Sequence, residues 1–303
     1  MRYKKLDLNL LVALDALLEE RNITRASTRL HLSQSAMSNA LARLREYFED
    51  DLLVQVGRTM ALTPKAEVLQ QAVHDVLLRI DTSIAAQPEF DCTQSDREFK
   101  ISASDYSMLV LVPRMLTLAG AQGSRVRIHL TPQMHSPARA LELGETDLLL
   151  IPKAFCSSEH PTQIIWTDDF VCVVWNGSRH VRETLDFDHY AAAGHVIMQP
   201  PGTPNLAFEA WFVQRYGLSR RVDVTTYSFA ALPALVVGTE LVATVHRRLA
   251  EQMARAFPVT LLPLPLPMPP FEQAMQWHKY RVSDPGLTWL RKLAVDAAAP
   301  GAG

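Results

Sequence analysis

The stretch TRASTRLHLSQSAMSNALARLRE, residues 24–46, contains two short helical patterns that meet at a tight junction, LHLS. Thr24 and Ser33 are each placed to cap one of these helices, because a hydroxyl can accept a backbone N–H that the first turn leaves unpaired. The apolar residues of the second pattern recur at helical spacing: Ala36, Met37, Ala40, Leu41, Leu44 and Phe48. Two such helices either pack into a core or hold one helix against DNA.

The rest of the second helix carries hydroxyls, amides and guanidinium groups, with no acidic residue before Glu46. These residues are Gln34, Ser35, Ser38, Asn39, Arg43 and Arg45. Amides pair with adenine edges, Arg with guanine edges, and Ser with either base or with phosphate. A solvated polar face is the alternative, although such a face more often carries Glu/Lys pairs. The pattern favours DNA binding and leaves core packing open.

The flanking residues predict a winged helix-turn-helix. An amphipathic helix is expected over residues 7–20, and two short β-like runs surround Gly57 within residues 51–63. Thr63-Pro64 then starts a long helix that runs to about residue 86. Its apolar residues follow a coiled-coil seam, which predicts dimerisation, with packing on its own domain as the alternative. The seam comprises Ala66, Leu69, Val73, Val76, Ile80 and Ile84.

Length and composition are those of a globular protein with about two domains, since 303 residues exceed one typical domain. The net charge of −2 provides no global basic field for nucleic acid. Three scattered cysteines indicate neither a disulfide framework nor a zinc site. No apolar run approaches the ~18 residues of a membrane helix. We therefore expect a cytoplasmic protein that does not contact the membrane.

After a linker, QPEFDCTQSDRE (residues 87–98), strands alternate with helices, which predicts an α/β fold with a parallel or mixed sheet. Ligands bind such sheets outside the carboxyl ends of the strands. Strands are expected at 99–105, 125–132, 146–152, 169–175, 195–199, 221–226, 240–245 and 274–277. Helices are expected at 106–119, 136–143, 205–216, 229–237, 246–256 and 287–298. The proline-rich segment 261–270 is expected to be an edge strand or a connector.

No nucleophile elbow, HExxH or Gly-rich phosphate loop occurs, so we expect no enzyme.

Residues 8–69, with LSQSAMSNALARLRE and the LTP helix start, resemble the DNA-binding domain of LysR-type transcriptional regulators. Two departures are Ser35, where the family usually has proline, and Leu44-Arg45, where it often has Leu-Glu. GETDLLLIP, FCSSEHP, WFVQRYGLSRRVDV and SDPGLTWLRKL extend the likeness along the chain. They resemble the branch that contains nodulation regulators of the NodD type and aromatic-catabolism regulators such as NahR.

This resemblance implies a winged helix-turn-helix over residues 1–63, a dimerising linker helix over 64–87 and a hinge over 88–97. Residues 98–303 would form a two-lobed effector domain of the periplasmic-binding (type 2) kind. The implied function is sequence-specific binding to double-stranded promoter DNA by homodimers that assemble into homotetramers. The regulator would act on RNA polymerase, mainly as an activator. It would need no cofactor and would respond to a small aromatic inducer held between the lobes.

The family match also implies residue roles. Gln34, Ser35, Ser38, Asn39 and Arg43 would face the major groove, and Thr24 and Arg25 would contact phosphate from the supporting helix. Arg58 would lie at the wing tip, while Arg45 either contacts DNA or pairs with Glu49. The implied effector-binding residues are Ser104, Asp105, Met134, Pro152, Asp169, His195, Gln199, Phe229 and Gln276.

Several effector positions have a structural alternative. Ser104 is also placed to cap the helix that begins near Tyr106, and His195 to be hydrogen-bonded at a strand start. Phe229 fits the core as well as a pocket. Asp169 would repel an anionic ligand, so a neutral phenol suits it better than a carboxylate. His246 stands where the family usually has proline, either at the pocket mouth or in solvent.

Overall fold

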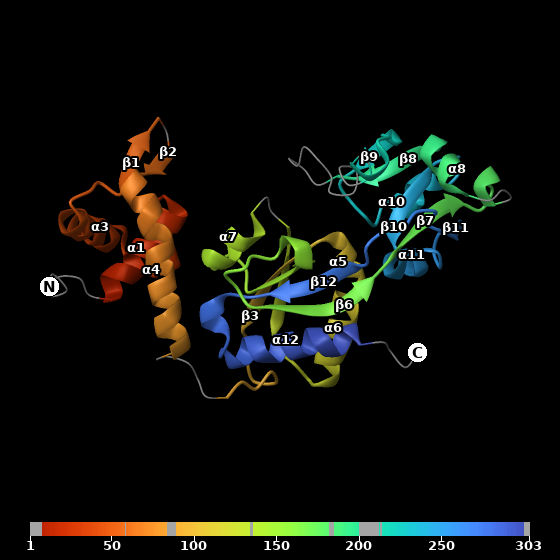
Figure 1. Ribbon diagram of the computed structural model, residues 1–303. Helices are drawn as coiled ribbons and strands as arrows, with labels where there is room; N and C mark the ends of the chain where they lie inside the picture. Colours follow the sequence, from red (N-terminus) through yellow and green to blue (C-terminus); the bar gives the residue numbers. More distant parts are fainter. Residues whose placement is uncertain are drawn as a thin grey trace.

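The computed structural model describes residues 8–57, 59–83, 89–133, 136–181, 185–199, 212 and 214–299. A small helical domain at the N-terminus is followed by one long helix and by two α/β lobes (Figure 1). The predicted fold class is thereby confirmed, including the winged helix-turn-helix and the two-lobed second half.

The N-terminal domain consists of three helices and a hairpin. They are α1 (Leu8–Glu20), α2 (Ile23–Arg29), α3 (Gln34–Phe48), β1 (Leu53–Val56) and β2 (Thr59–Leu62). Leu14, Met37 and Leu44 are fully buried where the three helices meet. The hairpin turns at Gly57, whose φ of +63° is a conformation that glycine adopts without steric cost.

Helix α4 (Pro64–Ser83) begins where the sequence predicted, because the Thr63 hydroxyl oxygen accepts the N–H of Ala66 at 3.1 Å. The predicted seam is wrong in part. Ala66 and Val73 are buried in the core of their own domain, against which Leu69 also packs. Among the described side chains of α4, the large apolar ones that are exposed are Val76, a seam residue, and Val68, which lies outside the seam; they are 44% and 77% exposed.

Lobe 1 is a five-stranded mixed sheet in the order β4-β3-β5-β12-β6, in which β3, β4 and β5 run parallel. Its strands are β3 (Glu98–Ala103), β4 (Arg127–Pro132), β5 (Leu148–Pro152), β6 (Thr162–Asp168) and β12 (Phe271–Gln276). Its helices are α5 (Asp105–Val110), α6 (Val112–Ala121), α7 (Pro137–Glu142), α12 (Pro285–Ala298), η2 (Lys153–Phe155) and η4 (Lys279–Arg281). The helix predicted over 106–119 is divided at Leu111, two residues before Pro113.

Lobe 2 is a second five-stranded sheet, in the order β11-β7-β10-β8-β9. Its strands are β7 (Phe170–Trp175), β8 (Gly194–Met198), β9 (Arg221–Thr226), β10 (Val242–His246) and β11 (Val259–Pro263). Its helices include α8 (Phe187–Ala192), α10 (Leu232–Val236), α11 (Arg247–Met253) and η3 (Arg179–Val181). Most of the helix predicted over 205–216 lies outside the described residues.

The chain crosses between the lobes twice, from β6 to β7 and from β11 to β12. The proline-rich segment 261–270 supplies the end of edge strand β11 and then the second crossing, as predicted. Strand β6 was not predicted; it is one of the two edge strands of lobe 1, and only Trp166 and Asp168 in it are buried. One continuous apolar cluster spans both lobes, so they are packed against each other around the crossings.

Candidate functional site

Helix α3 presents a polar face to solvent and buries the opposite face. Ser33 is its N-cap, and the Ser33 Oγ accepts the N–H of Ala36 at 3.1 Å. The exposed polar residues of the first two turns are Gln34, Ser35, Ser38 and Asn39. The buried residues are Met37, Leu41 and Leu44. Ala36 was predicted on the apolar face but is exposed, so Met37 is the residue of the first turn that packs into the domain.

Helix α2 supports α3, and its start differs from the prediction. The N-cap is Asn22 rather than Thr24, since Asn22 Oδ1 accepts the N–H of Arg25 at 2.9 Å and Ile23 is already helical. Thr24 and Arg25 are both exposed on the first turn. The Arg25 guanidinium lies 3.2 Å from the Glu20 carboxylate. Both residues are therefore accessible to a partner that approaches this end of α2.

The other three arginines assigned to DNA lie in different surroundings. Arg43 is exposed on α3. Arg45 instead donates from Nε to the carbonyl oxygen of Asp51 and from a terminal nitrogen to that of Leu53, each at 2.7 Å. Its guanidinium thus ties α3 to the first strand of the wing. Arg58 lies outside the described residues.

Lobe 1 reaches lobe 2 through the start of α5. Ser104 caps this helix, with its Oγ 3.3 Å from the N–H of Ser107. Asp105 Oδ2 accepts the hydroxyl of Ser228 at 2.6 Å and the N–H of Ala230 at 3.0 Å. Ser228 and Ala230 follow β9, so the Asp105 carboxylate joins the two lobes directly.

Seven residues form an interlobe cluster where the two lobes meet. They are Tyr106, Trp166, Asp168, Phe170, Phe229, His246 and Phe271. The Tyr106 hydroxyl donates to Asp168 at 2.7 Å and accepts the indole N–H of Trp166 at 2.9 Å. Burial raises the pKa of Asp168 above its usual value, although the hydrogen bond from Tyr106 opposes this shift.

His246 lies inside the interlobe cluster and not in solvent, since only 3% of it is exposed. Its ring stacks on Tyr106 with 4.2 Å between centroids, and the rings of Phe170, Phe229 and Phe271 surround it at 4.5–4.9 Å. Burial lowers the pKa of His246 to about 3, so the imidazole is neutral near pH 7. Phe229 is half-buried; it packs against the core and also belongs to the interlobe cluster.

His195 is held within lobe 2. It is fully buried, and its Nε2 lies 2.8 Å from the carbonyl oxygen of Tyr190. Burial, followed by the nearby Arg220 guanidinium, lowers the pKa of His195 to about 4. His195 is therefore hydrogen-bonded at the start of a strand, which was the predicted alternative to effector binding. Gln199 follows β8, and its N–H donates to the carbonyl oxygen of Thr226 at 2.7 Å.

Two further predicted effector residues occupy opposite ends of lobe 1. Pro152 ends β5 near the crossing to lobe 2, whereas Gln276 lies at the far end of β12. The Gln276 side chain accepts the N–H of Ser157 at 3.1 Å and donates to the Thr162 hydroxyl at 2.7 Å. The structure therefore does not bring Gln276 together with the interlobe residues. Met134 lies outside the described residues.

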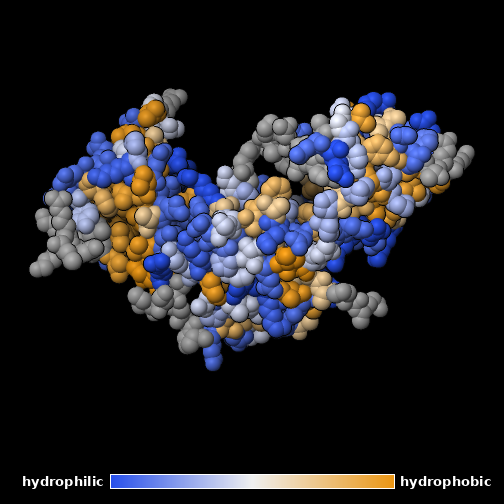
Figure 2. Space-filling model, viewed as in Figure 1, coloured by the Kyte–Doolittle hydropathy of each residue, from blue (hydrophilic) through white to orange (hydrophobic). Residues whose placement is uncertain are grey.

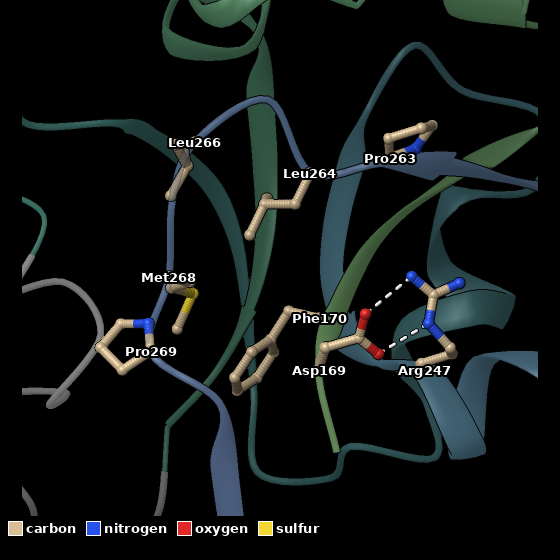
Figure 3. A pocket seen from close by; sticks show the side chains of 8 residues that line it. All are labelled: Asp169, Phe170, Arg247, Pro263, Leu264, Leu266, Met268 and Pro269. Carbon is tan, nitrogen blue, oxygen red and sulfur yellow. Dashed lines mark hydrogen bonds and ion pairs between the residues drawn. The ribbon is translucent and has the colours of Figure 1, made fainter. Parts of the chain in front are cut away.

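Asp169 lines an open cavity of about 250 Å³ beside the two crossings (Figure 3). Its carboxylate forms a bidentate ion pair with Arg247, at 2.6 and 2.8 Å. The remaining lining is apolar: Phe170, Pro263, Leu264, Leu266, Met268 and Pro269. Hydrogen bonds from Arg247 lower the pKa of Asp169. The negative charge that was expected to repel an anion is therefore already paired with a cation.

Sequence reasoning missed three polar residues at the meeting of the lobes, namely Tyr106, Asp168 and Gln273. Gln273 is 1% exposed and donates from Nε2 to the Ser107 hydroxyl at 3.1 Å. Tyr106 directly follows the predicted strand 99–105, and that position was a usable signal. Asp168 and Gln273 belong to crossing strands whose pairing the local pattern does not reveal.

Metal and membrane sites receive no support from the described residues. No group of three or more His, Cys, Asp or Glu side chains among them is placed to hold a metal ion. No helix in the described ranges combines the length and the apolar character needed to cross a bilayer.

Two family models together match most of the chain. Residues 8–67 match the bacterial regulatory helix-turn-helix proteins of the lysR family. Residues 93–299 match the LysR substrate binding domain. These spans coincide with the winged helix-turn-helix and with the two lobes.

Similar proteins extend the likeness over the full length. Nodulation protein D 2 of Rhizobium tropici is 40% identical over 299 residues, which cover 99% of this chain and 95% of that protein. The probable transcriptional regulator PA0477 of Pseudomonas aeruginosa has a similar structure, with a TM-score of 0.65 and 26% identity over 98% of this chain and 97% of that one. Full-length CbnR in complex with its target DNA shares the fold, with a TM-score of 0.52 and 16% identity over 97% of this chain and 100% of that one.

Proposed function

The chain belongs to the LysR family of DNA-binding transcriptional regulators, which are not enzymes, and we propose that it activates specific promoters in response to a small aromatic effector. The observation that carries the DNA-reading part is the polar face of α3. Gln34, Ser35, Ser38 and Asn39 stand exposed on its first two turns, free of acidic neighbours on that face. Amides and hydroxyls in this position suit base edges in the major groove.

Two copies of α3 would provide specificity that one copy lacks. Exposed apolar side chains gather over α1 and α4, and they are Leu8, Val12, Val68 and Val76 (Figure 2). A contiguous apolar surface of this kind commonly marks a protein interface. We propose that it forms a twofold homodimer contact, so that two recognition helices read an inverted repeat. Homotetramers would pair two such dimers, as the resemblance implies.

The effector is proposed to act at the interlobe cluster. The two lobes form the family's substrate-binding domain. Aromatic rings around His246 suit an aromatic ligand, because rings stack favourably in a dry site. The buried Asp168 carboxylate disfavours an anionic group beside it. A neutral phenol fits this chemistry better than a carboxylate, and its binding would change the contact with RNA polymerase by shifting the dimer arrangement.

The DNA-reading part is tested by replacing Ser38 with Asp in the full chain. A carboxylate on the exposed face of α3 would meet phosphate, so footprints at the target promoter should disappear while fold and dimer persist. Ser219→Asp is the matched control, since Ser219 is exposed in lobe 2, and it should bind DNA normally. Unchanged promoter affinity in Ser38→Asp would exclude this face as the DNA reader.

The effector part is tested by a thermal-shift screen of phenols, flavonoids and aromatic acids. A ligand that binds only the folded lobes raises the unfolding temperature as its concentration rises. We expect stabilisation by neutral phenols that is reduced in His246→Ala. Stabilisation by benzoates alone would contradict the proposed preference.

A further inference from the structure

Helix α4 is seated on lobe 1 of its own chain, against α7 and η4. His74 of α4 lies directly over Gly144, where an added Cβ would be 2.5 Å from the imidazole. Farther along α4, the Arg79 guanidinium lies 3.9 Å from the centroid of the Tyr280 ring. This contact physically joins the DNA-binding half of the chain to the effector-binding half.

The centre of this surface is a histidine contact, defined by His74, Asp75, His160 and His278. His278 is 2% exposed and its ring lies 4.9 Å from that of His160. Asp75 Oδ1 is 3.5 Å from His278 Nε2, yet the two form no hydrogen bond. Three imidazoles are thus gathered between α4 and lobe 1, with the Asp75 carboxylate beside His278.

Polar atoms in the histidine contact are buried without partners. Within the described part of the chain, His160 Nδ1 and Nε2, His74 Nε2 and Asp75 Oδ1 all lack a hydrogen bond. Water would satisfy these atoms if α4 moved away, so their burial weakens the contact relative to an apolar one. The surface is therefore built to separate more readily than the lobe cores beside it.

We propose that the histidine contact is a release point, at which α4 leaves lobe 1 when the imidazoles become protonated and returns when they are neutral. A protonated His278 in this place would be a buried cation beside Lys279 and Arg281, with the Asp75 carboxylate 3.5 Å away to offset it. The charged groups around the three rings are Asp15 of α1, Asp75 and Arg79 of α4, Glu142 of α7, Glu159, and Lys279 and Arg281 of η4.

The expected pH dependence follows from the imidazole pKa values when α4 is seated on lobe 1 and when it is released. Burial, then the neighbouring His160 and His74, lowers the pKa of His278 to about 4, and burial also lowers the pKa of His160. An imidazole freed into water returns to a pKa of about 6.5. The released state therefore binds more protons, and seating weakens as the pH falls from about 6.5 towards 4. One such histidine weakens seating about tenfold between pH 7.5 and 5.5.

The test is an intrachain distance measurement by pulsed electron paramagnetic resonance on the full chain. Spin labels at Gln71→Cys on α4 and Ala154→Cys on lobe 1 occupy exposed sites, in a background without Cys92, Cys156 and Cys172. Excess unlabelled protein ensures that only distances within one chain are read. We expect one short distance at pH 7.5 and a longer population at pH 5.5, with the seated-to-released ratio reduced about tenfold.

Matched variants separate the histidines from a general acid effect. His160→Gln with His278→Gln should abolish the pH response, whereas His129→Gln, on exposed β4, should keep it. His278→Gln alone should reduce the pH response, because it removes the imidazole whose pKa differs between the seated and released states. This single variant still tests the proposal if the double variant does not fold. An unchanged distance at pH 5.5, or a double variant that responds like the wild type, overturns the proposal. The readout needs neither DNA nor effector, so it is independent of the proposed function.

Discussion

The hydroxyl of Tyr106 is predicted to hold the interlobe cluster together, and Tyr106→Phe tests this by removing a single atom. In the wild type this hydroxyl donates to the Asp168 carboxylate at 2.7 Å and accepts from Trp166 at 2.9 Å. The substitution leaves a buried indole N–H unpaired and removes one donor from a buried carboxylate. Asp168 keeps only backbone N–H donors, from Asp169 and Arg248.

The expected loss is about 2–3 kcal/mol in the free energy of unfolding of the lobes, because a hydrogen bond to a buried charge is lost and a donor is left unpaired. Urea unfolding followed by tryptophan fluorescence reports on the lobes alone, since all five tryptophans follow residue 98. Tyr227→Phe is the matched control, because Tyr227 is 79% exposed, and it should cost almost nothing.

The loss should also depend on pH. The pKa of Asp168 is raised above 3.8 by burial, so its ionised form is a cost to the folded state once the pH exceeds this raised value. The Tyr106 hydroxyl opposes that shift, and without it the cost grows. The destabilisation should therefore be larger at pH 7 than at an acidic pH below the raised pKa of Asp168, where the carboxyl is protonated. Equal destabilisation in Tyr106→Phe and Tyr227→Phe, at either pH, would refute this reasoning.

Three further substitutions test other parts of the structure. Arg45→Gln removes the two hydrogen bonds that join α3 to the wing. It should lower the free energy of unfolding of the N-terminal domain by about 1–2 kcal/mol, measured by thermal unfolding with circular dichroism. Lost DNA binding at unchanged stability would show instead that Arg45 contacts DNA. The double variant Val68→Asp with Val76→Asp should convert dimers to monomers in sedimentation velocity. The control Val295→Asp, on α12, should remain dimeric. Dimers that persist in the double variant would place the interface elsewhere. Asp169→Asn breaks an exposed ion pair and should change stability by less than about 1 kcal/mol, and a larger loss would indicate a structural role for the cavity beside it.

Local sequence pattern predicted the structure correctly where residues within a few positions of one another determine it. The Ser33 cap, the Thr63-Pro64 helix start and the Gly57 turn each depend on residues within a few positions. It failed where distant residues decide. Ala66 and Val73, for example, pack into the core of their own domain. The Thr24 cap failed for a local reason, because Asn22 starts the helix two residues earlier and accepts the N–H of Arg25.

The candidate site shows the same division. The outward face of α3 follows from helical periodicity, so its exposed residues were found from the sequence. The interlobe cluster is made by two chain crossings, which bring Tyr106 beside Asp168 and His246 across 62 and 140 positions. Such pairings leave no periodic trace, so local pattern did not reveal Asp168. Gln276 was assigned from the family resemblance, and strand β12 places it at the far end from the crossing.

The central claim is that the exposed face of α3 reads base pairs, and selection from random-sequence DNA measures this directly. Wild-type protein and Gln34→Ala, with Ser219→Asp as the control, would be selected in parallel and their preferences compared position by position. Removing one amide that pairs with a base should relax the preference at one symmetric pair of positions, by about 1–3 kcal/mol, and leave the others intact. An identical preference at every position in Gln34→Ala, or a uniform loss across all positions, would contradict base reading by this side chain.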